Sequence, residues 1–175
     1  MSDGPSTPTP EPIVMPDDRL LARQMGARLI ARFEGFSPTP YQDQGGTWTI
    51  GFGTIRIDGQ PVTGETAPVS RSEGLVLLES DLRQKAAFVD ASVLVYATVN
   101  QLAALYSFTY NEGEGAERSS SVLRFLNEGQ TLEAANAFLL WDMITDPATG
   151  KLVFDQGLYN RRCAERAVFL GKMTA

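Results

Sequence analysis

The hydrophobic pattern of this chain changes from helical spacing to strand spacing at Gly35 and returns to helical spacing at Ser70. Over about residues 17–33, apolar side chains recur every three or four positions, which is typical of an amphipathic helix. After Gly35 come short β-branched and aromatic runs, separated by pairs typical of tight turns, namely Gly45-Gly46 and Asp58-Gly59. The pattern therefore predicts one helix and then a small antiparallel sheet over about residues 40–63.

The chain after residue 70 is predicted to be helical. Ser70 followed three residues later by Glu73 is the signature of a capping box, in which each side chain binds the other residue's backbone N–H at the start of a helix. A long helix is expected to begin there, and shorter helices are expected over about residues 99–111, 119–127, 131–141 and 159–170. A helix, a small sheet and then a helical bundle make an α+β fold.

The first residues are expected to stay outside this fold. Residues 1–16 are rich in Pro, Ser and Thr and poor in large apolar side chains, which predicts a flexible tail before one folded domain over residues 17–175. No apolar run approaches the ~20 residues that span a bilayer. The N-terminus also lacks the basic and apolar regions of a signal peptide. We therefore expect neither a signal peptide nor a membrane anchor.

Composition narrows the possible chemistry. The chain has no histidine, and Cys163 is its only cysteine. Intramolecular disulfides, the usual zinc sites and Ser-His-Asp or Cys-His catalysis are therefore excluded, and we expect neither a metal nor another cofactor. Carboxylates are the acid and base groups that remain, which points towards glycosidase-like chemistry. The net charge of −6 argues against nucleic-acid binding.

Three polar residues on different local structures form the candidate site. Glu34 ends the first predicted helix, Asp43 lies nine residues later, and Thr49 lies six residues further on in a strand. The negative end of the helix dipole and apolar neighbours disfavour the charged form of Glu34, which suits a general acid. Asp43, in a polar turn, is expected to stay ionised and to position a water molecule that Thr49 can share. Each residue is individually ordinary at such a place, so spacing alone does not establish a site.

A longer set of residues surrounds these three. It comprises Phe33-Glu34-Gly35-Phe36, Tyr41, Asp43 and Gly46–Gly53, then Gln101, Ala104, Leu105, Ser107, Phe108, Asn111, Gly113 and Gly115, then Leu123, Leu126, Asn127 and Gly129, and finally Trp141, Gly157-Leu158, Arg161-Arg162 and Glu165-Arg166. In this order they resemble the phage-type lysozymes, glycoside hydrolase family 24. The resemblance covers about residues 19–170, and several separated motifs are more specific than one fingerprint.

The resemblance implies an endolysin-like muramidase, which hydrolyses the β-1,4 bond between N-acetylmuramic acid and N-acetylglucosamine in bacterial peptidoglycan and so lyses the host cell. Glu34 would protonate the glycosidic oxygen. Asp43 and Thr49 would hold the attacking water on the opposite face of the sugar, as in an inverting hydrolase. Tyr41 and Phe52 are expected to contact the substrate.

One arginine of the last predicted helix is expected to support Glu34. The resemblance implies that either Arg161 or Arg162 approaches this carboxyl group, and spacing does not separate the two. The alternative for both is surface ion pairing with residues such as Glu165.

The resemblance also implies a bilobal shape. A sheet lobe over about residues 36–65 and a mainly helical lobe over about residues 92–171 would be joined by a long helix, with an active-site cleft between them. A monomer made in the host cytoplasm and acting on peptidoglycan glycan strands in the periplasm or cell wall, after release by a holin, is expected. The alternatives are a virion-associated or non-catalytic peptidoglycan-binding module, or a chitinase-like hydrolase.

One position departs from the family. Many relatives have histidine where this chain has Thr54, and that histidine can pair with an aspartate on the following helix, to which Asp81 corresponds. This ion pair cannot form here, which puts the support of the sheet in doubt. Because no histidine titrates, we also expect stability to depend little on pH between about 5 and 8.

Overall fold

The computed structural model describes residues 16–43 and 45–173. The predicted tail lies outside these residues except for Pro16, where the first helix begins. The helices are α1 (Pro16–Ile30), α2 (Arg71–Ser92), α3 (Val99–Glu112), α4 (Glu114–Ser119), α5 (Ser121–Asn127), α6 (Thr131–Ala137), the 3-10 turn η1 (Phe138–Leu140) and α7 (Gln156–Phe169). The strands are β1 (Ser37–Gln42), β2 (Trp48–Gly51), β3 (Arg56–Ile57), β4 (Gln60–Pro61), β5 (Met143–Thr145) and β6 (Leu152–Phe154).

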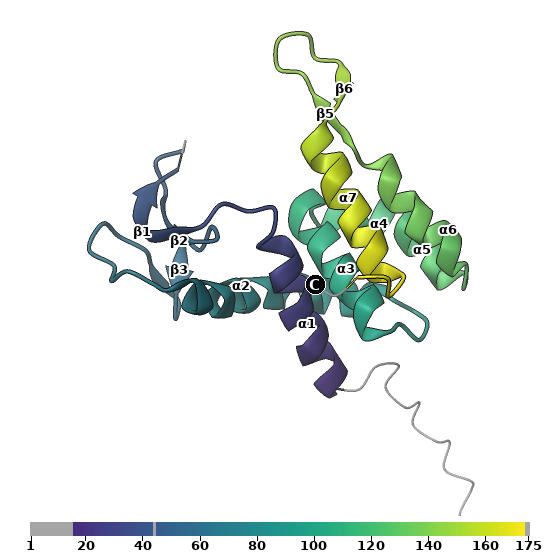
Figure 1. Ribbon diagram of the computed structural model, residues 1–175, viewed down its shortest axis with the longest axis horizontal. Helices are drawn as coiled ribbons and strands as arrows, with labels where there is room; N and C mark the ends of the chain where they lie inside the picture. Colours follow the sequence, from purple (N-terminus) through teal and green to yellow (C-terminus); the bar gives the residue numbers. More distant parts are fainter. Residues whose placement is uncertain (1–15, 44, 174–175) are drawn as a thin grey trace, which may run out of the picture.

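The elements form two lobes joined by α2, the longest helix (Figure 1). Strands β1 to β4 lie beside the beginning of α2, on the left of the view, and α3 to α7 form the other lobe on the right. Helix α1 packs on both α2 and α3 near the junction. The predicted α+β fold is thus confirmed.

The sheet lobe is built from two short hairpins. Strand β1 pairs antiparallel with β2, and β3 pairs antiparallel with β4. A single bridge between Ile50 and Thr54 links the two hairpins, and Thr54 is almost fully buried. The Thr54 hydroxyl donates a 2.6 Å hydrogen bond to Oδ2 of Asp81 on α2. The support of the sheet, which the missing ion pair put in doubt, is therefore provided in part by a hydrogen bond from a hydroxyl to the same carboxylate.

The start of α2 holds the sheet lobe against the helix. The predicted capping box is present: Ser70 Oγ accepts the N–H of Glu73 at 3.2 Å, and the Glu73 carboxylate accepts the N–H of Ser70 at 2.7 Å. One turn later, a Cβ added at Gly74 would lie 2.8 Å from the ring of Phe36 and 3.4 Å from the ring of Phe52. Glycine therefore lets these two aromatic rings approach the helix backbone closely.

Helix α3 forms the centre of the helical lobe. Its residues from Gln101 to Thr109 are all buried, and it packs against α1 on one side and α7 on the other. Aromatic rings fill the space beyond it: Phe108 lies edge-to-face with Phe138 at 5.4 Å and with Trp141 at 5.3 Å. Such pairs stabilise a core beyond simple area burial. The same core fixes the position of α7, which carries Arg161.

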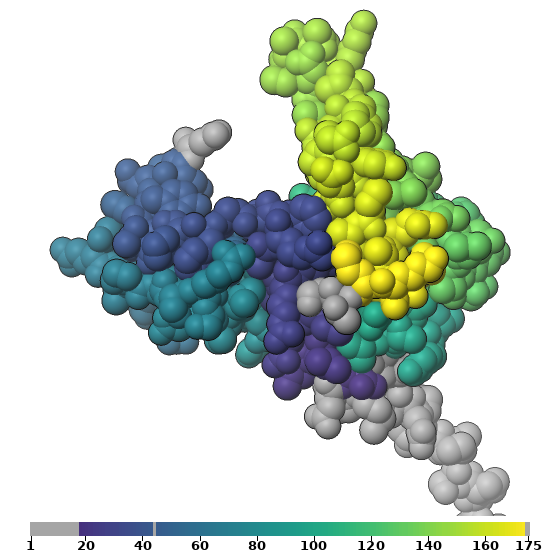
Figure 2. Space-filling model, in the orientation of Figure 1, coloured from purple at the N-terminus to yellow at the C-terminus, as the bar shows by residue number. Residues whose placement is uncertain are grey.

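The hairpin formed by β5 and β6 is not predicted from the sequence. It projects from the helical lobe (Figures 1 and 2), and all its strand residues are exposed. Asp146 builds its turn by accepting hydrogen bonds from Ala148 N at 2.9 Å and from Thr149 Oγ1 at 2.6 Å. These bonds lower the pKa of Asp146, the Thr149 hydroxyl having the largest effect. Strands of three residues are too short to show an alternating pattern.

One buried carboxyl group in the helical lobe has no hydrogen-bond partner among the described residues. Glu117 of α4 is 0% exposed, and both of its carboxyl oxygens are unpaired. Burial raises its pKa from 4.5 to about 7, while Arg118 lowers it and Glu114 raises it further. The expectation that stability depends little on pH between about 5 and 8 considered histidine alone, whereas the raised pKa of this desolvated carboxyl group predicts a dependence in that range.

We expect Glu117 to make the protein less stable as the pH rises. Its raised pKa means that the folded chain binds this proton more tightly than the unfolded chain, so stability present below pH 4.5 is lost as the pH rises through about 7. Glu117→Gln is expected to change the free energy of unfolding little at pH 4 and to raise it by about 3 kcal/mol at pH 8. Urea unfolding at both pH values measures the difference; equal effects at pH 4 and pH 8 would contradict it.

Candidate active site

A cleft separates the two lobes. Figure 2 shows the surface hollowed between the blue sheet lobe and the yellow-green side formed by α7 and the hairpin. The dark-blue link from α1 to β1 crosses between the lobes at the base of this hollow (Figures 1 and 2). Glu34 belongs to this link. Its N–H donates to the carbonyl oxygen of Ile30 at 3.1 Å, so Glu34 lies in the turn just after α1 rather than at the helix end itself.

Arg161 of α7 holds the Glu34 carboxyl group. Nη1 of Arg161 donates a 2.9 Å hydrogen bond to Oε1 of Glu34, and 33% of the Glu34 side chain is exposed while only 5% of the Arg161 side chain is. The guanidinium also lies 5.7 Å from the centre of the Phe33 ring. The acid is therefore accessible from the cleft on one side and fixed by a buried cation on the other.

Behind this pair, Glu165 fixes Arg161. The Glu165 side chain is fully buried one helical turn after Arg161, and its Oε1 accepts hydrogen bonds from Arg161 Nε at 3.3 Å and from Ser107 Oγ at 2.7 Å. Nη2 of Arg161 donates to the carbonyl oxygen of Ser107 at 3.4 Å. All three guanidinium nitrogens of Arg161 thus donate hydrogen bonds within the protein, and the bond from Nη1 is the one to Glu34.

Arg162 does not contact Glu34. Its side chain is fully buried and donates to Glu112 Oε1 at 3.2 Å, to Asn111 Oδ1 at 2.6 Å and to Glu165 Oε1 at 3.3 Å. Its Nε also lies 3.0 Å from Glu165 Oε2, with an angle that is poor for a hydrogen bond. Arg161 is therefore the arginine that supports Glu34, whereas Arg162 ties α7 to the end of α3.

These side chains form a buried ion cluster, defined here as Glu34, Glu112, Arg161, Arg162 and Glu165. Burial raises the pKa of the Glu165 carboxyl group above its usual value, although Arg162, Arg161 and the Ser107 hydroxyl partly offset this increase. Burial also lowers the pKa of Arg162. Glu165 contacts both buried guanidinium groups, at 3.3 Å from Arg161 Nε and 3.0 Å from Arg162 Nε, and these two contacts favour its ionised form over the neutral form that burial favours. We therefore assign the ionised form to Glu165.

Asp43 lies in the turn between β1 and β2. Its Oδ1 accepts the N–H groups of Gly45 and Thr47, both at 2.9 Å, and its own N–H donates to the carbonyl oxygen of Thr47. This turn explains why Asp stands here: the short side chain replaces a backbone acceptor. Asp43 is exposed, as a residue that positions water would have to be.

Thr49 lies on β2 and is 4% exposed. Its hydroxyl donates to the carbonyl oxygen of Thr47 at 3.1 Å, which leaves the oxygen lone pairs as acceptors. Tyr41 pairs with Thr49 across the two strands and remains exposed, so its predicted contact with substrate stays a prediction.

Phe52 corrects one expectation. Its side chain is 2% exposed and lies 5.0 Å from Phe36, ring centre to ring centre, against the start of α2. A ring packed into the core of the sheet lobe has no face to offer a sugar, so Phe52 is a structural residue.

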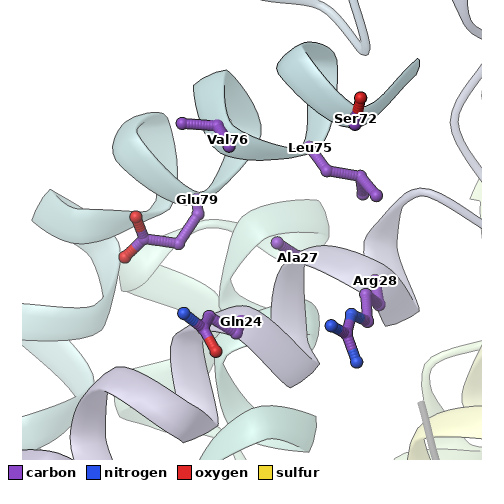
Figure 3. A pocket seen from close by; sticks show the side chains of 7 residues that line it. All are labelled: Gln24, Ala27, Arg28, Ser72, Leu75, Val76 and Glu79. Atoms are coloured by element: carbon purple, nitrogen blue, oxygen red, sulfur yellow. The ribbon is translucent and has the colours of Figure 1, made fainter.

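A separate pocket lies away from the candidate site. It has a volume of about 400 Å³, and it is found between α1 and α2 (Figure 3). Its walls are Gln24, Ala27, Arg28, Ser72, Leu75, Val76 and Glu79, and none of the site residues lines it. The open cleft and not this pocket therefore contains the candidate chemistry.

The described residues offer no alternative metal centre or membrane span. Within residues 16–43 and 45–173, no group of three or more His, Cys, Asp or Glu side chains is placed to bind a metal ion. No helix in the same part of the chain is long and apolar enough to cross a membrane.

Sequence reasoning missed part of the site. The sequence identifies Ser107 only as a residue of the shared motif and Glu165 as a motif residue and a partner for surface ion pairs, and it gives no signal for Glu112. The i, i+4 spacing of Arg161 and Glu165 is a usable signal for an ion pair. It does not show that the pair is buried, because burial depends on α3.

Known proteins resemble this chain over most of its length. The family model described as phage lysozyme matches residues 31–165. The chain is 38% identical over 148 residues to the endolysin of Bacillus phage PZA, which covers 83% of this chain and 54% of the relative. It is 37% identical over 148 residues to the endolysin of Salmonella phage P22, which covers 83% of this chain and 94% of the relative. The chain thus spans about half the length of the Bacillus phage relatives.

A solved structure shows the same arrangement. The endolysin from Escherichia coli O157:H7 phage FAHEc1 superposes with a TM-score of 0.74 at 34% sequence identity, over 86% of this chain and 94% of that one. Similarity in both sequence and fold extends across the two lobes and the cleft.

Proposed function

Because this chain belongs to the phage lysozyme family, we propose that it is an endolysin-like muramidase that cleaves the β-1,4 bond between N-acetylmuramic acid and N-acetylglucosamine in peptidoglycan. One observation carries the proposal. A partly exposed carboxyl group, Glu34, lies between the lobes with its orientation fixed by the buried Arg161 at 2.9 Å. A positioned carboxylic acid beside an open cleft is what protonation of a glycosidic oxygen requires.

The proposed reaction uses three residues. Glu34 donates its proton to the glycosidic oxygen as the bond from that oxygen to the anomeric carbon of muramic acid breaks. A water held by Asp43 and Thr49 adds its oxygen to that carbon from the opposite face and passes a proton to Asp43. The turn that fixes Asp43 Oδ1 orients the carboxylate before substrate arrives, which lowers the ordering cost of the attack.

The first test is hydrolysis by the wild-type protein. Purified peptidoglycan and chloroform-permeabilised Gram-negative cells are the substrates, with reducing sugar and turbidity as readouts. Release of reducing ends supports the muramidase. Binding to peptidoglycan without release would support a non-catalytic wall-binding module instead, and cleavage of chitin oligomers without peptide stems would support a chitinase-like hydrolase.

The stereochemistry gives a separate prediction. If water attacks from the face opposite to the leaving group, the new reducing end is released first as the α-anomer, because the β-bond is inverted. Proton NMR of a soluble peptidoglycan fragment during the first minutes of hydrolysis measures the anomer before mutarotation. Initial release of the β-anomer would show a retaining reaction and would remove the water-holding role of Asp43 and Thr49.

We further propose where the protein works. The relatives are endolysins, and the proposed substrate lies in the cell wall. We propose that the protein is a monomer that reaches the cell wall after a holin opens the inner membrane, which agrees with both the relatives and the location of the substrate. Lysis of cells that express this chain with a holin, and its absence in cells that express the chain alone, tests the release route.

A further inference from the structure

The position of Arg161 raises a problem for a general acid. Glu34 must carry a proton when substrate binds, yet a guanidinium nitrogen lies 2.9 Å from its Oε1. A cation at hydrogen-bond distance favours the ionised form of a carboxyl group. Arg161 is 95% buried on this side of the cleft, so solvent screens its charge poorly.

The buried ion cluster contains the compensation. Arg161 and Arg162 carry two positive charges, and Glu165 and Glu112 carry two negative charges. The charges of these four groups sum to zero without any charge on Glu34. Removing the charge of Glu165 would leave a net positive cluster, and ionisation of Glu34 would then restore the balance.

We propose that Glu165 is a positioning residue that lets Glu34 keep its proton, by balancing the charge of Arg161 and by fixing the guanidinium through Nε. The proposal rests on the acid role of Glu34 in the proposed function. Glu165 does not touch substrate, because its side chain is fully buried behind Arg161. Glu165 affects Glu34 through Arg161, which contacts both carboxyl groups. Its second contact, with Arg162, lies away from Glu34.

The groups that face this cluster come from several elements. Helix α3 contributes the hydroxyl of Ser107, the amide of Asn111, the carboxylate of Glu112 and the phenol of Tyr110, whose pKa is raised to about 12 by burial first and then by Glu34. On the next turn of α7, Arg166 points away and donates to Asn136 at the end of α6. No other ion pair to the cluster occurs among the described residues, so Glu165 is the negative charge closest to Arg161 besides Glu34 itself.

The test compares Glu165→Gln with the wild type. Carbon-13 NMR of labelled glutamate carboxyls, with Glu34→Gln as the assignment variant, follows the titration of Glu34 directly. We expect its midpoint to fall by about one pH unit in Glu165→Gln. The alkaline limb of the hydrolysis profile is expected to move by the same amount, with about tenfold lower activity on that limb and near wild-type activity at acid pH.

A matched control uses the same substitution on the surface. Glu128 is 44% exposed and pairs with Arg124 on α5, so Glu128→Gln is expected to move neither the midpoint nor the limb. The double variant Arg161→Gln/Glu165→Gln removes one charge of each sign, and its midpoint is expected at or above that of the wild type. A purely structural role for Glu165 would lower activity equally at all pH values.

Two results overturn the proposal. One is a folded Glu165→Gln variant with the wild-type midpoint, and the other is a double variant that keeps the lowered midpoint. If Glu165→Gln does not fold, Glu112→Gln replaces it, because it removes the other negative charge that balances the two arginines and its side chain is 21% exposed; an unchanged midpoint there also overturns the proposal. If the wild type does not hydrolyse peptidoglycan, the proposed function fails, while the NMR titration still decides the charge-balancing role.

Discussion

Replacing Glu34 by glutamine is expected to reduce hydrolysis of peptidoglycan by roughly 10²–10⁴-fold, the usual contribution of a general acid. Glutamine keeps the size of the side chain and an oxygen that accepts the hydrogen bond from Arg161, so the local structure is expected to stay in place. It has no proton to give to the glycosidic oxygen. The measurement is the rate of reducing-end release from purified peptidoglycan at saturating substrate, for wild type and variant.

The controls for Glu34→Gln separate chemistry from folding. Circular dichroism and urea unfolding establish that the variant is folded, and Glu128→Gln supplies the same substitution at an exposed ion pair on α5. Binding of the variant to insoluble peptidoglycan is expected to match that of the wild type. A folded Glu34→Gln protein with wild-type turnover would show that another residue is the acid and would end the assignment of this site.

Local signals in the sequence account for most of the elements that place Glu34. The capping box at Ser70 and Glu73 was predictable because its two partners are three residues apart and act through their own backbone. The change of hydrophobic spacing at Gly35 likewise predicted that a helix gives way to strands. The end of α1 was placed three residues too late, because its last turn tightens into hydrogen bonds from Arg32 to Leu29 and from Phe33 to Ile30.

The features that sequence reasoning missed depend on contacts between distant segments. Ser107 and Glu165 are 58 residues apart, and only the packing of α3 on α7 brings them to 2.7 Å. Phe52 belongs to the same motif as Thr49, but the close approach of Gly74 on α2 turns its ring into the core. A sequence motif shows which residues relatives share, whereas the packing of the folded chain determines which of their side chains are accessible from the cleft.

Two buried acids of this lobe contrast in how they are compensated. Glu117 has no partner among the described residues, so its burial is offset by proton uptake near pH 7. Glu165 is equally buried but contacts two guanidinium groups and a hydroxyl, which favour its charge. The two glutamates are therefore expected to respond in opposite ways to substitution. Removing the charge of Glu117 raises the free energy of unfolding at alkaline pH, whereas removing the charge of one member of the ion cluster lowers it, because the partner's charge is then buried without compensation.

That contrast makes Arg162 the position where we expect the largest loss of stability. Its side chain is fully buried and contacts Glu112, Asn111 and Glu165, with the Phe108 ring 5.0 Å from the guanidinium. Arg162→Met keeps the length of the side chain but leaves Glu165 with one guanidinium instead of two. Breaking a buried pair in this way costs about 3–5 kcal/mol, which is a large fraction of the stability of a domain this size.

Urea unfolding at pH 7 measures the loss, with Arg124→Met as the matched control. Arg124 is 57% exposed and pairs with Glu128 at 3.3 Å, so its replacement is expected to cost less than about 1 kcal/mol. The cost of Arg162→Met is expected to shrink towards acid pH, because protonation of Glu165 and Glu112 removes the charges that the variant leaves uncompensated. Equal losses for the two arginines would mean that the buried cluster adds little to the stability of the helical lobe. A large loss for Arg162→Met that does not depend on pH would mean that the cluster stabilises this lobe by packing and not by charge.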